Sequence, residues 1–227
     1  MRAVLSVVIP TLNADAALPA CLAALIEGLE AGLIRELIIS DGGSGDGTLR
    51  MADEAGAVIV QGAPSRGGQL RRGAHVASGE WLLFLHADTV LPVGWAGAVR
   101  DQIARGGPAY FRLGFDATGL MPMLVAGWAN LRSRLFGLPY GDQGLLISRA
   151  DYDAAGGYRD IALMEDVAMA RALKGRLAAL PLRVCTSAAR YQADGWLLRG
   201  MRNLALLARY FAGGDPARLA ARYRASK

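Results

Sequence analysis

The clearest pattern in the chain is an unbroken apolar run at 81–85, Trp-Leu-Leu-Phe-Leu, which ends at His86 and Asp88. A run without polar alternation is typical of a strand buried on both faces in the middle of a parallel sheet. In open α/β sheets, ligands bind beyond the carboxyl ends of the strands. The pattern therefore predicts that Asp88 faces a binding crevice, and His86 should point to the same side if this segment is extended.

The first ninety residues alternate between strand-like and helix-like segments. Strands are predicted at 4–9, ending at Pro10, and then at 37–40 and 58–60. Between them, helices are predicted after a cap at Asp15, after a cap at Ser44 or Asp46, and within 64–79. This alternation predicts an α/β fold with a doubly wound, mostly parallel sheet and helices on both faces.

The second half of the chain has a less regular pattern. A helix is predicted at 95–105, a strand at 110–115 nearer an edge of the sheet than the first four strands, and a helix at 120–136. Residues 196–211 predict an amphipathic helix with Arg199, Arg202 and Arg209 on a shared face. Such a helix either docks on the domain or lies at a membrane interface.

A length of 227 residues suits one domain with an appendage. We expect a domain at 1–190, divided into a half at 1–90 and a half at 91–190, followed by a helical extension at 191–227. The net charge of +5 conceals an asymmetry, because residues 171–227 hold 12 of the 25 basic residues and two acids, leaving the rest of the chain at −5. The basic end suits an anionic substrate or a membrane surface. Nucleic acid is a weaker candidate, because this end lacks lysine clusters and interleaved aromatic residues.

The sequence contains few signals for the cellular location of the protein. Cys21 and Cys185 are too few for a disulfide framework and lack partner ligands at metal-binding spacing. We recognise no signal peptide at the start and no apolar run near the ~20 residues that span a bilayer. The expected location is the cytoplasm, with peripheral contact at the inner face of the membrane as the alternative.

Carboxylates mark the ends of predicted strands and the irregular segments. They are Asp41, Asp88, Asp142 and the pair Glu165-Asp166. Acids gathered at one edge of a sheet suit a metal ion or proton transfer. Each one also has an ordinary alternative, since acids commonly occupy turns and the first turns of helices. For His86, a metal or nucleotide contact and a purely structural role remain equally open.

Four segments together carry a resemblance to a known family. They are Ser6-Val7-Val8-Ile9-Pro10-Thr11-Leu12-Asn13, Asp41-Gly42-Gly43-Ser44-Gly45-Asp46-Gly47-Thr48, His86-Ala87-Asp88, and Glu165-Asp166. In order and spacing they resemble the family 2 glycosyltransferases of GT-A fold. The form His-Ala-Asp-Thr, the segment Tyr140-Gly141-Asp142-Gln143-Gly144 and the Arg-rich end are similar to a narrower branch, the rSAM/selenodomain-associated or arsenosugar biosynthesis glycosyltransferases.

The resemblance implies a donor site for a nucleoside-diphosphate sugar. Thr11, Asn13 and Asp41 match positions that hold the nucleobase and ribose, while Asp88 matches the second aspartate of a D-x-D motif that binds Mg²⁺ or Mn²⁺. His86 stands where the family has the first aspartate.

The resemblance also implies the catalytic group. Asp166, next to Glu165, matches the base that takes the proton from a hydroxyl acceptor, and a single displacement would invert the anomeric configuration. The candidates for orienting the sugar or diphosphate are Asp142, Gln143, Arg66, Arg71 and Arg190.

Other classes of protein fit less well. A dinucleotide-dependent oxidoreductase would need its glycine-rich loop after the first strand, whereas Gly43-Ser44-Gly45-Asp46-Gly47 follows the second. A nucleotidyltransferase acting on sugar phosphates would need a glycine-rich and basic loop in place of Pro10-Thr11-Leu12-Asn13. A non-catalytic binder of nucleotide sugars would not require the second acidic motif.

Overall fold

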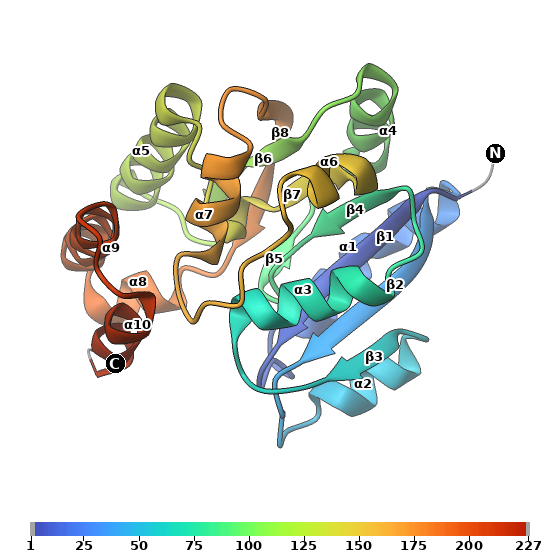
Figure 1. Ribbon diagram of the computed structural model, residues 1–227, viewed down its shortest axis with the longest axis horizontal. Coiled ribbons are helices and arrows are strands. Elements are labelled where there is room, and N and C mark those ends of the chain that lie inside the picture. Colours follow the sequence, from blue (N-terminus) through green and yellow to red (C-terminus); the bar gives the residue numbers. More distant parts are fainter. Residues whose placement is uncertain (1–2, 226–227) are drawn as a thin grey trace.

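The computed structural model describes residues 3–225. Within this range the chain forms an eight-stranded mixed sheet with the order β3-β2-β1-β4-β7-β6-β8-β5 (Figure 1). The strands are β1 (Leu5–Thr11), β2 (Ile34–Asp41), β3 (Val58–Gln61), β4 (Trp81–Phe84), β5 (Thr89–Val90), β6 (Ala109–Phe115), β7 (Leu145–Ser148) and β8 (Ala178–Thr186). Strands β3, β2, β1 and β4 run parallel, while β7 lies antiparallel between β4 and β6. The predicted α/β fold class is confirmed.

Helices cover both faces of the sheet. They are α1 (Leu18–Glu30), α2 (Thr48–Glu54), α3 (Arg66–Val76), α4 (Trp95–Arg105), α5 (Leu120–Phe136), the short 3-10 helix η1 (Gly141–Gln143), α6 (Arg149–Ala154), α7 (Glu165–Ala172), α8 (Ala189–Asp194), α9 (Trp196–Phe211) and α10 (Pro216–Ala225). Leu18 and Leu25 of α1 and Trp95 of α4 are buried in one core. Leu70 of α3 and Tyr152 of α6 are buried in the other. Strand side chains point alternately to the two faces, so the two cores sandwich the sheet.

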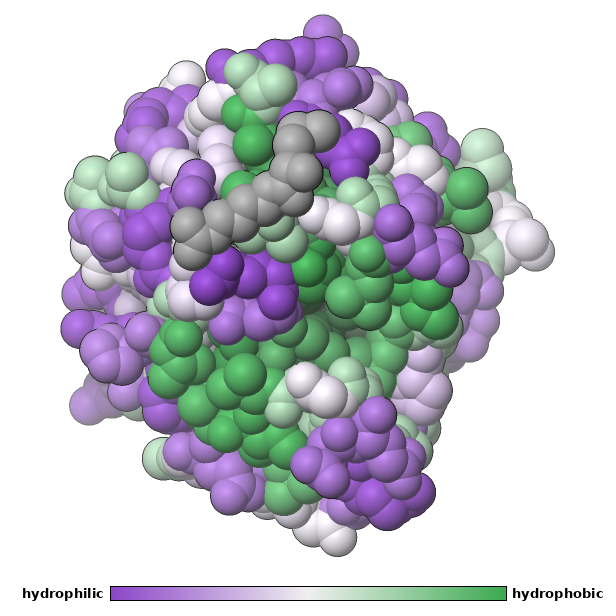
Figure 2. All heavy atoms as spheres, turned by 90° about the vertical axis from the view of Figure 1, so that its right-hand side faces the viewer, coloured by the Kyte–Doolittle hydropathy of each residue, from purple (hydrophilic) through white to green (hydrophobic). Residues whose placement is uncertain are grey.

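The C-terminal helices pack on the domain through a third, smaller cluster. Leu206 and Leu207 of α9 and Leu219 of α10 are buried there with Met164 and Val167 at the start of α7. In Figure 1, α5, α9 and α10 lie on the side of the molecule away from the N-terminus. Figure 2 shows the opposite side, where hydrophilic residues surround an apolar area. Among residues 3–225, no helix combines the length and the apolar character needed to cross a membrane.

The structure corrects two predictions about the sheet. Strand β6, which contains the predicted strand at 110–115, is an interior strand between β7 and β8. Strand β3, one of the first four strands, is instead the edge strand next to β2. The first strand does not end before Pro10 but continues to Thr11, paired with Asp41 of β2. Pro10 is tolerated because its nitrogen faces the side of β4, and β4 ends at Phe84, opposite Val8.

The two predicted side-chain caps are also wrong. Helix α1 begins at Leu18 after Ala17, and helix α2 begins at Thr48 after Gly47, in both cases without a side-chain cap bond. The Asp46 carboxylate instead accepts hydrogen bonds from the Thr48 backbone and from the backbone N–H of Asp15. The acid therefore ties the two loops together.

Candidate active site

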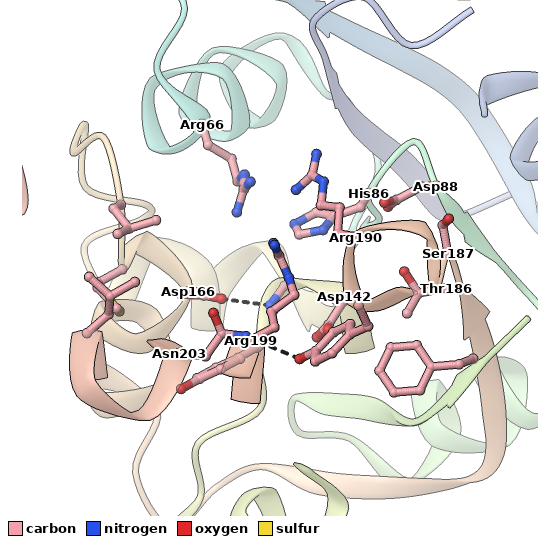
Figure 3. A pocket seen from close by; sticks show the side chains of 17 residues that line it. Arg66, His86, Asp88, Asp142, Asp166, Thr186, Ser187, Arg190, Arg199 and Asn203 are labelled. Carbon is pink, nitrogen blue, oxygen red and sulfur yellow. Dashed lines mark hydrogen bonds between the residues drawn. The ribbon is translucent and has the colours of Figure 1, made fainter. Parts of the chain in front are cut away.

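Two cavities meet beyond the carboxyl ends of β1 and β4. The first, which we call the strand-end cavity, has a volume of about 460 Å³ and is lined by Thr11, Asn13, Pro64, Gln69 and Ala87, among others. The second, which we call the acidic cavity, is lined by Tyr140, Asp142, Asp166, Tyr191, Arg199 and Asn203, among others (Figure 3). Both cavities share Arg66, His86, Asp88, Leu163 and Arg190. A ligand that spans both cavities would therefore pass two guanidinium groups, an imidazole and a carboxylate.

The wall of the strand-end cavity depends on Asp41, which does not itself line the cavity. Asp41 is fully buried, and its carboxylate accepts hydrogen bonds from the Thr11 and Ser44 hydroxyls and from the Gly43 and Ser44 backbone N–H groups. Burial alone would raise the pKa of Asp41, but these hydrogen bonds outweigh it and lower the pKa. Asp41 is therefore an ionised anchor for the loop after β2.

Asn13 joins the same loop to the end of β1. It adopts a left-handed backbone conformation with φ 51°, and its side-chain oxygen accepts a hydrogen bond at 2.9 Å from the Gly45 N–H. Asparagine tolerates this conformation better than most residues. Residues 11–13 are thus held in a fixed shape at the rim of the cavity.

The segment after β4 places both His86 and Asp88 at the junction of the cavities, but it is not extended as predicted. Thr89 N–H donates to the His86 carbonyl at 3.1 Å, which makes residues 86–89 a turn. Burial, reinforced by the nearby Arg66 charge, lowers the pKa of His86 to about 3, against the opposing effect of Asp166. His86 is therefore neutral near pH 7, and an imidazole in this form can donate one hydrogen bond and accept another.

Asp142 lies in η1 at the wall of the acidic cavity. Burial raises its pKa to about 6, Arg132 opposes this, and the neighbouring Asp166 and Asp88 carboxylates add to the rise. Among the described residues, Asp142 Oδ1 is buried without a hydrogen-bond partner. Buried polar atoms are normally paired, so this oxygen is suited to contact a ligand.

The first turn of α7 carries two adjacent acids, Glu165 and Asp166, whose side chains point in different directions. Met164, the residue before the helix, has a left-handed conformation with φ 68°, a costly geometry for a residue other than glycine that is often found at functional sites. Asp166 faces the acidic cavity, and its Oδ2 accepts a hydrogen bond at 2.8 Å from the Gly141 N–H. Glu165 points the other way, is 1% exposed, and lies 3.5 Å from Nη1 of Arg66.

The Glu165 environment disfavours its charged form. Burial raises the pKa of Glu165 to about 7, with Arg66 opposing the rise and Asp166 adding to it. Neither carboxylate oxygen has a hydrogen-bond partner within the described residues. The arrangement makes Asp166 the acid that can reach a ligand, with Glu165 behind it.

Apart from the arginines, the structure brings six of the predicted site residues to the two cavities. They are Thr11, Asn13, His86, Asp88, Asp142 and Asp166. Asp41 and Glu165 are buried behind the cavity walls, and the fully buried Gln143 donates to the Phe111 carbonyl and accepts from Ser133. Arg71 lines a separate cavity with Arg149. Of the three candidate arginines, Arg66 and Arg190 reach the junction.

Apart from Arg190 of α8, sequence reasoning missed the residues of α8 and α9 that line the acidic cavity. Tyr191, Arg199 and Asn203 line it, and Arg199 is held at 2.6 Å from Asp194. The sequence pattern predicts Arg199 on the polar face of an amphipathic helix, yet it is 8% exposed. The i, i+4 spacing of Arg199 and Asn203 puts both on one helical face, which was the only available signal.

The side chains of the two cavities could hold a divalent cation only together with other ligands, such as waters and phosphate oxygens. Among residues 3–225, no group of three or more His, Cys, Asp or Glu side chains is placed to hold a metal ion. Mg²⁺, however, commonly binds through one or two carboxylates together with waters and substrate phosphates. Asp88 at the junction and the unpaired Asp142 Oδ1 are suited to that mode of binding.

Comparison with known proteins gives the class. Residues 6–122 match the model of the family described as glycosyl transferase family 2. This match covers half of the chain, and the chain therefore belongs to that family. The fold is that of GT-A glycosyltransferases, with a curled, mostly parallel sheet between helices.

The curated relatives of the chain are similar to part of it. PGL/p-HBAD biosynthesis glycosyltransferases from Mycobacterium tuberculosis and Mycobacterium bovis are 39% identical over 93 residues, which is 38% of this chain and 36% of theirs. The match thus spans about a third of the length of these curated relatives.

Two solved structures share the fold. Glucosyl-3-phosphoglycerate synthase from M. tuberculosis, in complex with Mn²⁺, UDP and glucosyl-3-phosphoglycerate, has a TM-score of 0.55 and 20% identity, covering 81% of this chain and 71% of that one. TarS from S. aureus has a TM-score of 0.62 and 16% identity, covering 91% of this chain and 39% of that one.

Proposed function

We propose that this protein is a metal-dependent, inverting glycosyltransferase that moves a sugar from a nucleoside-diphosphate sugar to a hydroxyl acceptor. The observation that carries the proposal is the meeting of the strand-end and acidic cavities at Arg66, His86, Asp88 and Arg190, with Asp166 on the far side from Asp88 (Figure 3). A nucleotide in the first cavity and a sugar in the second would place the diphosphate at the junction.

The diphosphate would be held by charge. Arg66 and Arg190 supply guanidinium groups, which match phosphate oxygens in a two-pronged geometry. Asp88, with Asp142 beside it, would hold Mg²⁺ or Mn²⁺. When bound, the cation supplies charge neutralisation for the departing diphosphate. Solved structures of the same fold with UDP and Mn²⁺ or Mg²⁺ support this choice of metal.

Asp166 would act as the general base. The hydrogen bond from the Gly141 N–H to Oδ2 fixes its orientation. It would take the proton of the acceptor hydroxyl as that oxygen attacks the anomeric carbon, while the diphosphate leaves on the opposite face of the sugar. One displacement of this kind inverts the configuration.

The remaining assignments are part of the same proposal. The half at 1–90 would bind the donor, the half at 91–190 the acceptor, and the extension at 191–227 would complete the acidic cavity. The acceptor would be a small metabolite or a lipid. We keep the arsenosugar biosynthesis branch as the narrower assignment, and it would favour a small metabolite. The cytoplasm is the proposed location, with contact of 196–211 at the inner face of the membrane.

The test is thermal unfolding with a panel of nucleoside diphosphates and their sugars, with and without Mn²⁺. A ligand at ~100 times its dissociation constant stabilises the folded state by ~2.7 kcal/mol. We expect a Mn²⁺-dependent shift with one nucleotide that disappears in Asp88→Ala and persists in Asp101→Ala, a matched control at an exposed position of α4. A shift only with NAD(P) or a nucleoside triphosphate would overturn the proposal.

The two alternative functions have distinct outcomes. A nucleotidyltransferase would release pyrophosphate from a nucleoside triphosphate and a sugar phosphate. A non-catalytic binder would show the thermal shift, yet its rate of donor cleavage would be the same in the wild type and in Asp166→Asn.

A further inference from the structure

The outward faces of α5 and α9 are apolar, which is the reverse of the usual pattern for a surface helix. Their exposed apolar side chains are Leu120, Met123, Leu124, Trp128, Leu131, Leu135 and Phe136 on α5, and Leu197, Leu198, Met201, Leu204 and Phe211 on α9. All of these are at least 41% exposed. Spacings of three and four residues place each set along one side of its helix. An extended apolar surface of this kind normally marks an interaction site.

The two faces join into one surface, which we call the α5–α9 surface. The helices contact each other and lie side by side in Figure 1. Between them and α7 lies a groove of about 500 Å³, with Trp128 of α5 and Leu204 and Phe211 of α9 among its walls. Arg171 and Lys174 stand at its rim, with the Arg171 guanidinium 5.3 Å from the Phe211 ring. The groove is thus mostly apolar, with the buried Arg132 also in its wall and the exposed Arg171 and Lys174 beside it.

The charge of this surface has one sign. Neither α5 nor α9 contains an acidic residue. Arg134 on α5 and Arg209 on α9 are exposed, as are Arg171 and Lys174 beside the groove. Cations around an apolar helical face match a bilayer, in which acyl chains lie beneath anionic headgroups.

We propose that the α5–α9 surface docks on a membrane that contains anionic lipids, with a lipid chain in the groove between α5, α7 and α9. A second copy of the chain fits this surface less well, because a symmetric contact would bring the same cations together and neither helix offers an acid to pair with them. The contact is peripheral, since the helices lie on the domain and the groove is open at the surface.

Docking would also orient the active site. The inner side of α9 lines the acidic cavity through Arg199, Asn203 and Leu206, while its outer side forms part of the α5–α9 surface. One helix therefore separates the cavity from the membrane. This last consequence rests on the proposed function: the hydroxyl acceptor would be an amphiphile presented from the bilayer.

The test is flotation of the purified protein with vesicles of phosphatidylcholine alone or mixed with phosphatidylglycerol, at low and high salt. We expect binding to the mixed vesicles that weakens at high salt. The double variant Leu131→Glu/Met201→Glu should lose roughly tenfold or more of this binding, because each change removes a large apolar side chain from the contact. The matched control is Val93→Glu, which changes a residue that is 94% exposed and lies two positions before α4. In Figure 1, α4 lies on the other side of the molecule from α5 and α9.

Two further measurements keep the outcomes separate. Thermal unfolding verifies that the variants fold, and the nucleotide-dependent thermal shift reports the donor site independently of vesicles. No binding to the mixed vesicles at low salt would overturn the proposal. It would also be overturned if sedimentation velocity showed a dimer that Leu131→Glu/Met201→Glu converts to a monomer, while the protein binds no vesicles. Vesicle binding without a nucleotide shift would leave docking intact and count against the proposed function alone.

Discussion

The imidazole of His86 lies directly against the backbone of Gly141, and the contact is so close that only glycine fits. A Cβ atom on residue 141 would lie 2.4 Å from Nε2 of His86 and 2.8 Å from Cε1. The Gly141 N–H meanwhile donates to Asp166. Gly141 thus joins the segment after β4 to the first turn of α7, which are the two motifs that carry the proposed chemistry.

We therefore expect Gly141→Ala to impair transfer by displacing His86. Overfilling a packed site costs roughly 1–3 kcal/mol, and a misplacement of about 1 Å in an active site can cost roughly 100-fold in rate. Steady-state kinetics and thermal unfolding of the variant test this. Gly97→Ala is the control: a Cβ there meets nothing within 4 Å, and alanine within α4 should slightly stabilise the fold. Unchanged kinetics in Gly141→Ala would show that the position of His86 is irrelevant.

Asp166→Asn should lower the rate of transfer by ~10² to 10⁴ while leaving donor affinity nearly unchanged. The amide keeps the shape of the side chain but cannot accept the acceptor's proton. The measurements are kcat for transfer and the nucleotide-dependent thermal shift, with Asp101→Asn as the control at an exposed acid. A variant that retains full kcat would remove Asp166 from the mechanism.

Asp142 should set an acid limit on activity. Burial raises its pKa to about 6, so the carboxylate is neutral below that pH and can no longer assist a cation. We expect kcat/KM of the wild type to fall as the pH drops through about 6. In Asp142→Asn the rate should be low at every pH and this limb should be absent. An identical acid limb in both proteins would assign it to another group.

Glu165 should make the fold less stable at high pH. Its pKa is raised to about 7 in the folded protein from the usual 4.5, so its unfavourable ionisation begins above about pH 4.5 and is complete above about pH 7. One unit of pKa shift corresponds to about 1.4 kcal/mol. The difference in free energy of unfolding between Glu165→Gln and the wild type should therefore grow by roughly 2–3 kcal/mol, in favour of the variant, from pH 5 to pH 8. Chemical denaturation at both pH values measures this, and a gain that does not grow with pH would contradict the assignment.

Much of the structure of the half at 1–90 follows from local sequence patterns. The strand and helix alternation of the first ninety residues and the position of Asp88 beyond a buried strand both agree with the structure. These features have short-range causes, because burial on both faces and the 3.6-residue period are written in neighbouring residues. The expectation of a donor site for a nucleoside-diphosphate sugar came from the family resemblance of the segments at 6–13 and 41–48.

Other features depend on contacts between distant segments, and only the tertiary structure decides them. Strand β7 inserts antiparallel between β4 and β6, which moves β6 into the interior of the sheet. Thr11 and Asp41 are the last residues of β1 and β2, yet Thr11 lines the strand-end cavity and Asp41 lies beneath it. Such choices are set by strand pairing, which local periodicity does not encode.

The two acids at the start of α7 show the same division. The sequence by itself identified the pair as chemically important, but adjacent helical residues point about 100° apart, so only one of them can face a given cavity. Packing against Arg66 and the core turned Glu165 inward and left Asp166 facing the acidic cavity. The sequence determined which chemical groups are available, and the folded structure determined which of them can meet a substrate.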